Sequence, residues 1–197
     1  MKYPTDLQTL ISLLQKLPSV GKKSAERYAF AMLDWKIKDL VDIASLLNTL
    51  KTRIQTCSSC GCLMDQGRCD FCKDDRESSK MCIISSPKDA YAIEDTHAYR
   101  GLYHVIDTLL SPLDGRTADQ LDLDKLTARI KEAQTQEVII ALDSTLEGDA
   151  TALYIKNHLD TLGISVTRLA FGMPIGSTLD FIDEGTLSMA MTGRRSF

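Results

Sequence analysis

Four cysteines in two pairs constrain this chain more than any other feature. Cys57 and Cys60 form one CxxC pair, and Cys69 and Cys72 form a second pair eight residues later. Two such pairs can place four thiolates around one Zn²⁺ as a closed tetrahedron, with Zn–S distances of about 2.3 Å. No coordination position is left for a substrate. The pattern therefore predicts one structural zinc ion per chain, held by a small finger over residues 57–72.

The alternative is that these cysteines are reduced core residues without a metal. Core cysteines usually lie in apolar runs, whereas this segment is polar and contains Gly61 and Gly67, which we expect to form turns. Cys62 breaks the pair spacing and Cys82 lies inside an apolar run, so neither is expected to be a ligand.

The chain as a whole has the composition of a folded globular protein. It has 197 residues, of which 44% are hydrophobic and 25% charged. No apolar run approaches the roughly 20 residues that a membrane-spanning helix needs, and the N-terminus does not resemble a secretory signal. We therefore expect a cytoplasmic protein with no membrane partner, in which the cysteines are reduced.

Residues 1–56 differ from the remainder in charge and in pattern. They carry nine Lys and Arg against five Asp and Glu, a net charge of +4, which leaves −8 for the rest. Apolar residues recur at helical spacing, so three helices are expected: one opened by a capping box at Thr5 and Gln8 and ended by Pro18, one from Val20 or Gly21, and one from about Lys38. A basic helical module thus precedes an acidic body.

The segment from Leu17 to Ala25, LPSVGKKSA, joins two of these helices through a short hairpin. Backbone N–H groups at the start of a helix can bind a phosphate, and Lys22, Lys23 and Arg27 would reinforce that site. The segment resembles a helix-hairpin-helix DNA-binding motif, although the usual first hairpin glycine is Ser19. A plain helical hairpin with a solvated basic face is an equal alternative. GKKS is not a nucleotide-binding loop, because the upstream glycine that such a loop needs is replaced by Lys16.

From residue 81 onward the pattern changes to short apolar runs alternating with helices. MCIIS, EVIIALD and ISVTRLA are typical of buried strands, and a helix from about Gly148 to Leu162 would connect the last two into a βαβ unit. We therefore expect an α/β domain with a parallel sheet over residues 80–170, followed by a C-terminal segment over 171–197.

An acidic cluster follows the expected strand EVIIALD. Asp143, Glu147 and Asp149 lie at the carboxyl end of that strand, where α/β domains bind ligands and metals. The run resembles the acidic motif of Toprim domains. Catalytic Toprim domains also have a Glu at the end of the first strand and a second Asp two residues after the first Asp. Ser85 and Thr145 occupy those two places here. The acidic cluster is as consistent with carboxylates that only stabilise the N-terminus of a helix as with a metal site.

The order of these modules resembles the RecR family of recombination mediators over essentially the whole chain. The resemblance is carried by LPSVGKKSAERYAF, CSSC with CDFC, YRGLYHV, LEGDATALYI and TRLAFGMPIGSTLDFIDEGTL. It implies an α+β multi-module protein: helix-hairpin-helix, four-cysteine zinc finger, Toprim domain and C-terminal oligomerisation segment. Ser19, Ser85 and Asp143 depart from the family's usual Gly, Glu and Asn, and Ser85 weakens the expectation that the Toprim face binds metal or a partner.

The resemblance also implies a function without catalysis. The protein would form a dimer or tetrameric ring through its two ends, bind single- and double-stranded DNA without sequence preference, and act with RecO, and in many bacteria RecF, to load RecA onto single-stranded DNA. The alternatives are a Mg²⁺-dependent Toprim nuclease or topoisomerase-like enzyme, and an adaptor that binds only proteins. If the hairpin face does not bind DNA, the next candidates are Arg100, Arg116 and Arg129, in the interior of a ring.

Overall fold

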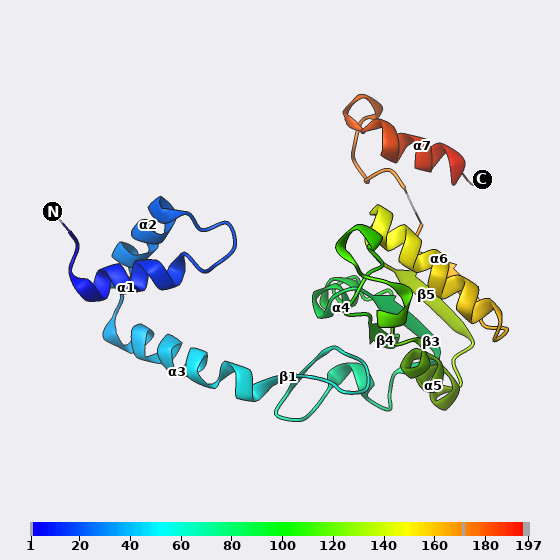
Figure 1. The fold of residues 1–197 in the computed structure, drawn as a ribbon, viewed down its shortest axis with the longest axis horizontal. Helices are drawn as coiled ribbons and strands as arrows, with labels where there is room; N and C mark the ends of the chain where they lie inside the picture. Colours follow the sequence, from blue (N-terminus) through cyan, green and yellow to red (C-terminus); the bar gives the residue numbers. More distant parts are fainter. Residues whose placement is uncertain (1, 171, 195–197) are drawn as a thin grey trace. The chain divides into compact units, whose positions relative to one another are not determined.

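The computed structural model describes residues 2–170 and 172–194 (Figure 1). The chain divides into two compact units, one up to Ile54 and one from Gln55 onward, and each is described here by itself. Across the described ranges, no helix is both long enough and apolar enough to cross a membrane.

The N-terminal unit contains the three helices that the sequence predicts: α1 (Thr5–Leu14), α2 (Lys22–Leu33) and α3 (Ile37–Arg53). Ile11, Ala25 and Ala29 form a small core between α1 and α2. The predicted capping box is wrong. Pro4 occupies the cap position and has no side-chain acceptor, so Thr5 already lies inside the helix. The core is small because two of its three central residues are alanines.

The cysteine-rich segment folds into a short two-stranded sheet and a turn of 3₁₀ helix. Strands β1 (Ile54–Thr56) and β2 (Leu63–Asp65) pair, and the 3₁₀ helix η1 covers Asp70–Cys72. The prediction that residues 1–56 are all helical is therefore wrong at the last three, because Ile54–Thr56 pairs with β2. Gly61 and Gly67 lie in turns at φ +79° and +78°, as their spacing predicts.

A four-stranded parallel sheet follows, in the order β4-β3-β5-β6. Its strands are β3 (Glu77–Ile84), β4 (Gly101–Val105), β5 (Glu137–Ala141) and β6 (Ser165–Arg168), and its helices are α4 (Pro87–Glu94), α5 (Leu123–Ala133) and α6 (Leu146–Asp160). The βαβ unit of β5, α6 and β6 is confirmed. β4 and α5 are not among the elements predicted from the sequence, although Leu123, Leu126 and Ile130 have helical spacing and are buried.

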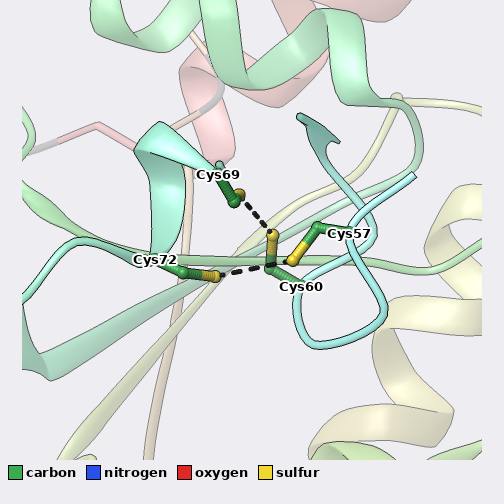
Figure 2. A group of neighbouring side chains, drawn as sticks. All are labelled: Cys57, Cys60, Cys69 and Cys72. Atoms are coloured by element: carbon green, nitrogen blue, oxygen red, sulfur yellow. Dashed lines mark hydrogen bonds between the residues drawn. The ribbon is translucent and has the colours of Figure 1, made fainter. Parts of the chain in front are cut away.

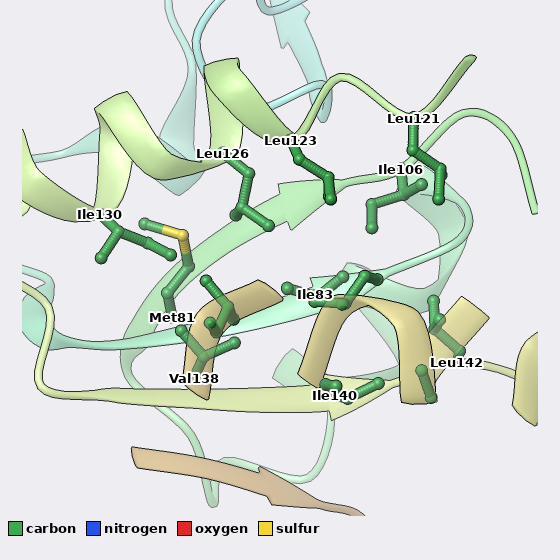
Figure 3. Close-up of a cluster of buried hydrophobic side chains, with 13 residues drawn as sticks. Met81, Ile83, Ile106, Leu121, Leu123, Leu126, Ile130, Val138, Ile140 and Leu142 are labelled. Carbon is green, nitrogen blue, oxygen red and sulfur yellow. The ribbon is translucent and has the colours of Figure 1, made fainter. Parts of the chain in front are cut away.

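The alternation of residues along β3 divides the domain into two cores. Met81 and Ile83 face α5 and α6 in an aliphatic cluster (Figure 3). Cys82 and Ile84 face the opposite side, where they pack with α4 and with the cysteine-rich segment. Successive side chains of a strand point to opposite faces, so the sheet carries helices on one face and the cysteine-rich segment, with α4, on the other.

Short 3₁₀ turns and one helix complete the described chain. Turns η2 (Pro112–Asp114) and η3 (Ala118–Gln120) connect β4 to α5. After β6 come η4 (Leu179–Phe181) and α7 (Glu184–Thr192), and the Asp183 carboxylate caps α7 by accepting from the Thr186 N–H. Phe181 and Ile175 in this tail are largely exposed.

Candidate metal centre and nucleic-acid interface

Cys57, Cys60, Cys69 and Cys72 converge on one point (Figure 2). Their sulfurs all lie within 4.8 Å of one another, with Cys57 Sγ 3.9 Å from Cys72 Sγ and Cys60 Sγ 3.5 Å from Cys69 Sγ. A tetrahedral Zn²⁺ with Zn–S bonds of about 2.3 Å requires S–S separations of about 3.8 Å. The four cysteines are thus positioned to hold a metal ion, and the soft thiolate donor set fits Zn²⁺.

Backbone hydrogen bonds hold the first cysteine pair in place. Cys57 N–H donates to the Cys62 carbonyl at 2.8 Å, and Gly61 N–H donates to the Cys57 carbonyl at 2.9 Å. The Cys60 carbonyl accepts from Val105 N–H at 2.8 Å, which ties this turn to the end of β4. A Cβ atom on Gly61 would lie 2.7 Å from Val105 Cβ, so only glycine allows the turn to approach the strand this closely.

The thiols are crowded and partly buried, which disfavours four separate negative charges. Burial raises the pKa of Cys69 to about 11. The pKa of Cys72 is raised as well, first by its hydrogen bond with Cys60 and then by burial. A divalent cation reverses this preference, because it binds the thiolate form.

The remaining two cysteines lie outside this group. Cys62 is fully buried, and its N–H donates to Cys60 Sγ at 3.4 Å. Cys82 is buried in β3, where desolvation raises its pKa to about 12. Neither belongs to the group of sulfurs that could hold a metal, which agrees with the sequence interpretation.

The hairpin between α1 and α2 has a left-handed residue at position 19, although Ser19 stands where the motif usually has glycine. Ser19 adopts φ +64°, in the left-handed region that glycine favours. Gly21 caps α2 with extended backbone, and no side chain caps this end. The first N–H groups of α2 therefore have no partner within the helix and remain free to bind an anion.

The three predicted DNA-binding cations lie around this helix start. Lys22, Lys23 and Arg27 are all exposed. The Arg27 guanidinium lies 5.5 Å from the centre of the Tyr28 ring. Within the described part of the chain none of the three forms a salt bridge, in contrast to Lys73, Lys80 and Lys156.

The acidic edge of the sheet is engaged in protein contacts. Ser85, at the place of the catalytic glutamate, donates its hydroxyl to Asp89 at the start of α4. Asp149 forms a salt bridge with Arg168. Thr145 caps α6 by accepting from Gly148 N–H at 3.1 Å. Asp143 is exposed and Glu147 is partly buried, and among the described residues neither belongs to a group of three side chains that could hold a metal ion.

The three alternative DNA-binding arginines have different environments. Arg100 is exposed. Arg116 forms a salt bridge with Asp114 at 2.7 Å. Arg129 is only 8% exposed and its guanidinium contacts the carbonyl of Tyr103 and the sulfur of Cys72. Sequence reasoning missed this contact, because Arg129 and Cys72 are 57 residues apart.

Comparison with known proteins assigns families to three parts of the chain. The RecR helix-hairpin-helix model matches residues 7–51, the Toprim domain model matches 79–170, and the RecR C-terminal model matches 172–195. Proteins named "Recombination protein RecR" align over their full length and over all of this chain: 48% identity for Protochlamydia amoebophila, 44% for Chlamydia trachomatis serovar D and 42% for Chlamydia caviae.

Proposed function

Because this chain belongs to the RecR family of recombination proteins, we propose that it acts as a non-enzymatic, DNA-binding recombination mediator. It would work in the cytoplasm with RecO, and in many bacteria RecF, to load RecA onto single-stranded DNA. The observation that carries the DNA-binding part is the start of α2, where free backbone N–H groups lie beside three exposed cations.

We infer that this site binds phosphates. Lys23 and Arg27 are four residues apart on α2 and therefore share one helix face, next to the N-terminal N–H groups. Their charges are not neutralised by salt bridges in the described chain, so they can replace the counterions of a nucleic acid. Contacts to phosphates carry no base information, so binding should be independent of sequence.

The test is a titration of labelled DNA at several salt concentrations. Lys23→Ala and Arg27→Ala should each weaken binding, and each lost phosphate contact should reduce the slope of log K against log salt by roughly 0.7 to 0.9. Lys51→Ala, an exposed lysine at the far end of α3, is the matched control. Unchanged affinity and slope in both variants would reject the site and favour Arg100 in its place.

Gly21 offers a second and independent test. A Cβ at this position would meet nothing within 4 Å, so the fold of this chain gives no steric reason for glycine. We propose that the absent side chain lets a DNA phosphate approach the N–H groups of α2. Gly21→Ala should therefore weaken DNA binding while the N-terminal unit stays folded. Full binding by Gly21→Ala would mean that the phosphate does not come close at this point.

Zinc is proposed to have a structural role, one ion per chain on Cys57, Cys60, Cys69 and Cys72. These residues supply a closed set of four soft ligands. When bound, the ion would stabilise the fold of the segment by about 10 kcal/mol. Elemental analysis of protein purified without chelators should give one zinc per chain. A value near zero would exclude this assignment.

The proposal that the protein is not an enzyme is supported by the altered acidic edge. With Ser85 bound to Asp89 and Asp149 paired with Arg168, a two-metal phosphoryl-transfer site lacks most of its ligands. We expect no nicking, ligation or nucleotide hydrolysis with Mg²⁺ or Mn²⁺. Robust nicking that disappears in Asp143→Ala would establish the rival function, a Toprim nuclease.

Self-association into a dimer or a tetrameric ring is proposed from the uncovered apolar surface of α3. This helix has no buried residue, and Ile37, Val41 and Leu47 are 80%, 60% and 65% exposed. Several exposed large apolar side chains on one helix are typical of an interface. Solution mass should exceed the monomer mass and fall in Val41→Glu or Leu47→Glu. A strictly monomeric mass at micromolar concentration would contradict the proposal.

The third candidate, an adaptor that binds only proteins, is favoured by the net charge of −4. Loading assays separate it from the mediator. With RecO present, the chain should speed RecA assembly on single-stranded DNA coated by its binding protein, and the double variant Lys23→Ala/Arg27→Ala should be impaired. If that variant remains fully active, the contact of this chain with DNA is dispensable and the adaptor function is favoured.

A further inference from the structure

A buried arginine without a carboxylate partner lies against the cysteine cluster. Arg129, on α5, is 8% exposed, and in the described chain it forms no salt bridge. Its Nη1 donates to the Tyr103 carbonyl and lies 3.4 Å from His104 Nδ1, while its Nη2 lies 3.8 Å from Cys72 Sγ. A buried cation is costly unless an anion compensates it. The sheet and α5 supply no such anion at these contacts.

The cysteine cluster supplies the missing charge once it holds a metal. Four thiolates around one Zn²⁺ carry a net charge of −2. A guanidinium whose Nη2 is directed at one of these sulfurs can donate a hydrogen bond to it and reduce the negative charge on that thiolate. The carbonyl of Tyr103 fixes the other end of the guanidinium, so the group is held in place on β4.

We propose that Arg129 is the charge partner of the metal–thiolate cluster and a positioning residue for Cys72. It would strengthen metal binding from outside the four ligands, and it would connect the cysteine-rich segment to the sheet and to α5. Arg129 would then belong to the metal centre and would not be available to DNA, unlike the ring-interior role considered from the sequence.

The test measures zinc affinity by competition with a chromophoric chelator in the full-length chain. Arg129→Gln keeps hydrogen-bond donors but loses the charge, and we expect zinc affinity to fall about 10- to 100-fold. Arg129→Lys keeps the charge, so its affinity should lie closer to that of the unmodified chain. Equal affinities for Gln, Lys and the unmodified chain would overturn the proposal.

The matched control is Arg76→Gln. Arg76 is also an arginine at the junction of the cysteine-rich segment and the sheet, but it pairs with Glu94 and lies over the Phe71 and Tyr103 rings. Its substitution should destabilise the junction and leave zinc affinity within about twofold. If Arg76→Gln and Arg129→Gln weaken zinc binding equally, Arg129 acts only through general stability and the proposal is wrong.

A measurement on the unmodified chain avoids any folding defect of the variants. In protein labelled with ¹⁵N-arginine, exchange of zinc for cadmium should shift one guanidinium signal, because the metal changes the charge on the sulfur that Arg129 faces. Arg129→Lys identifies that signal by its disappearance. If no guanidinium signal moves on metal exchange, Arg129 does not contact the metal-bound thiolates.

Discussion

Replacing Ser19 by glycine should stabilise the N-terminal unit. Ser19 has φ +64°, and its exposed side chain forms no hydrogen bond within the described residues. A left-handed conformation costs an L-residue roughly 1–2 kcal/mol. Glycine removes this cost but loses about 0.4–1 kcal/mol through the greater freedom of the unfolded chain. The difference of these two ranges is about 0–1.6 kcal/mol, with a central net gain of about 0.8 kcal/mol.

The assay uses the single tryptophan as a local reporter. Trp35 lies between α2 and α3, inside the N-terminal unit, so its fluorescence follows the unfolding of that unit. For a domain of this size, the expected gain raises the midpoint of thermal unfolding by about 2–8 °C. Ser19→Ala should give no such gain, because alanine keeps the Cβ that makes the conformation unfavourable.

A second control tests whether the effect is local. Gln134 also has positive φ, +54°, but it ends α5 in the other unit. Gln134→Gly should stabilise that unit and leave the Trp35 transition unchanged. The reasoning is refuted if Ser19→Gly leaves the Trp35 midpoint unchanged or lowers it, since the hairpin would then not hold Ser19 in the left-handed region.

Four further substitutions, one of them a control, have expected outcomes. Gly61→Ala should lower the free energy of unfolding by at least about 2 kcal/mol and accelerate zinc loss to a chelator, because the new Cβ would lie 2.7 Å from Val105 Cβ. Gly148→Ala should be similarly harmful in urea unfolding, since its Cβ would lie 2.0 Å from the Asp143 carbonyl oxygen, whereas Gly172→Ala, in open space, should be neutral. Burial lowers the pKa of His104 to about 4. The unfolded chain then binds the extra proton below a pH of about 6.5, so stability falls as pH drops from about 6.5 toward 4, by about 2 kcal/mol between pH 7 and 5. His104→Gln should lose that part of the pH dependence, and equal pH profiles for the two proteins would contradict it.

The modules of this fold were predictable where the sequence pattern is local. Two CxxC pairs specify a four-sulfur cluster within sixteen residues, and the run EVIIALD specifies a buried strand. Strand β4 was harder to predict because it begins with Gly101 and contains a buried polar residue, His104, which interrupts the apolar pattern. Helix α5 has a clear amphipathic pattern and could have been predicted from it.

The contacts between modules were not predictable in the same way. Arg129 and Cys72 meet because α5 lies near the strand that the cysteine-rich segment covers, and nothing in either local sequence indicates this. The local sequence also does not indicate which carboxylates of the acidic edge are paired. Asp149 appears in the sequence as a metal-ligand candidate, but its salt bridge with Arg168 depends on the pairing of β5 with β6.

The position of the cysteine-rich segment makes it part of the sheet's second core, and this determines how far the loss of metal should spread. The Cys60 carbonyl bonds to Val105, Phe71 packs edge-on against Tyr103, and Arg129 bridges Tyr103 and Cys72, so three separate contacts converge on β4. Among the described strands β4 pairs only with β3, which makes it an edge strand. An edge strand has one neighbour to support it, and here the cysteine-rich segment covers its outward face. Removal of the metal should therefore loosen β4 before β5, which is held between β3 and β6. In chelator-treated protein the amides of β4 should therefore exchange before those of β5, because amides open first where the fewest independent contacts hold them.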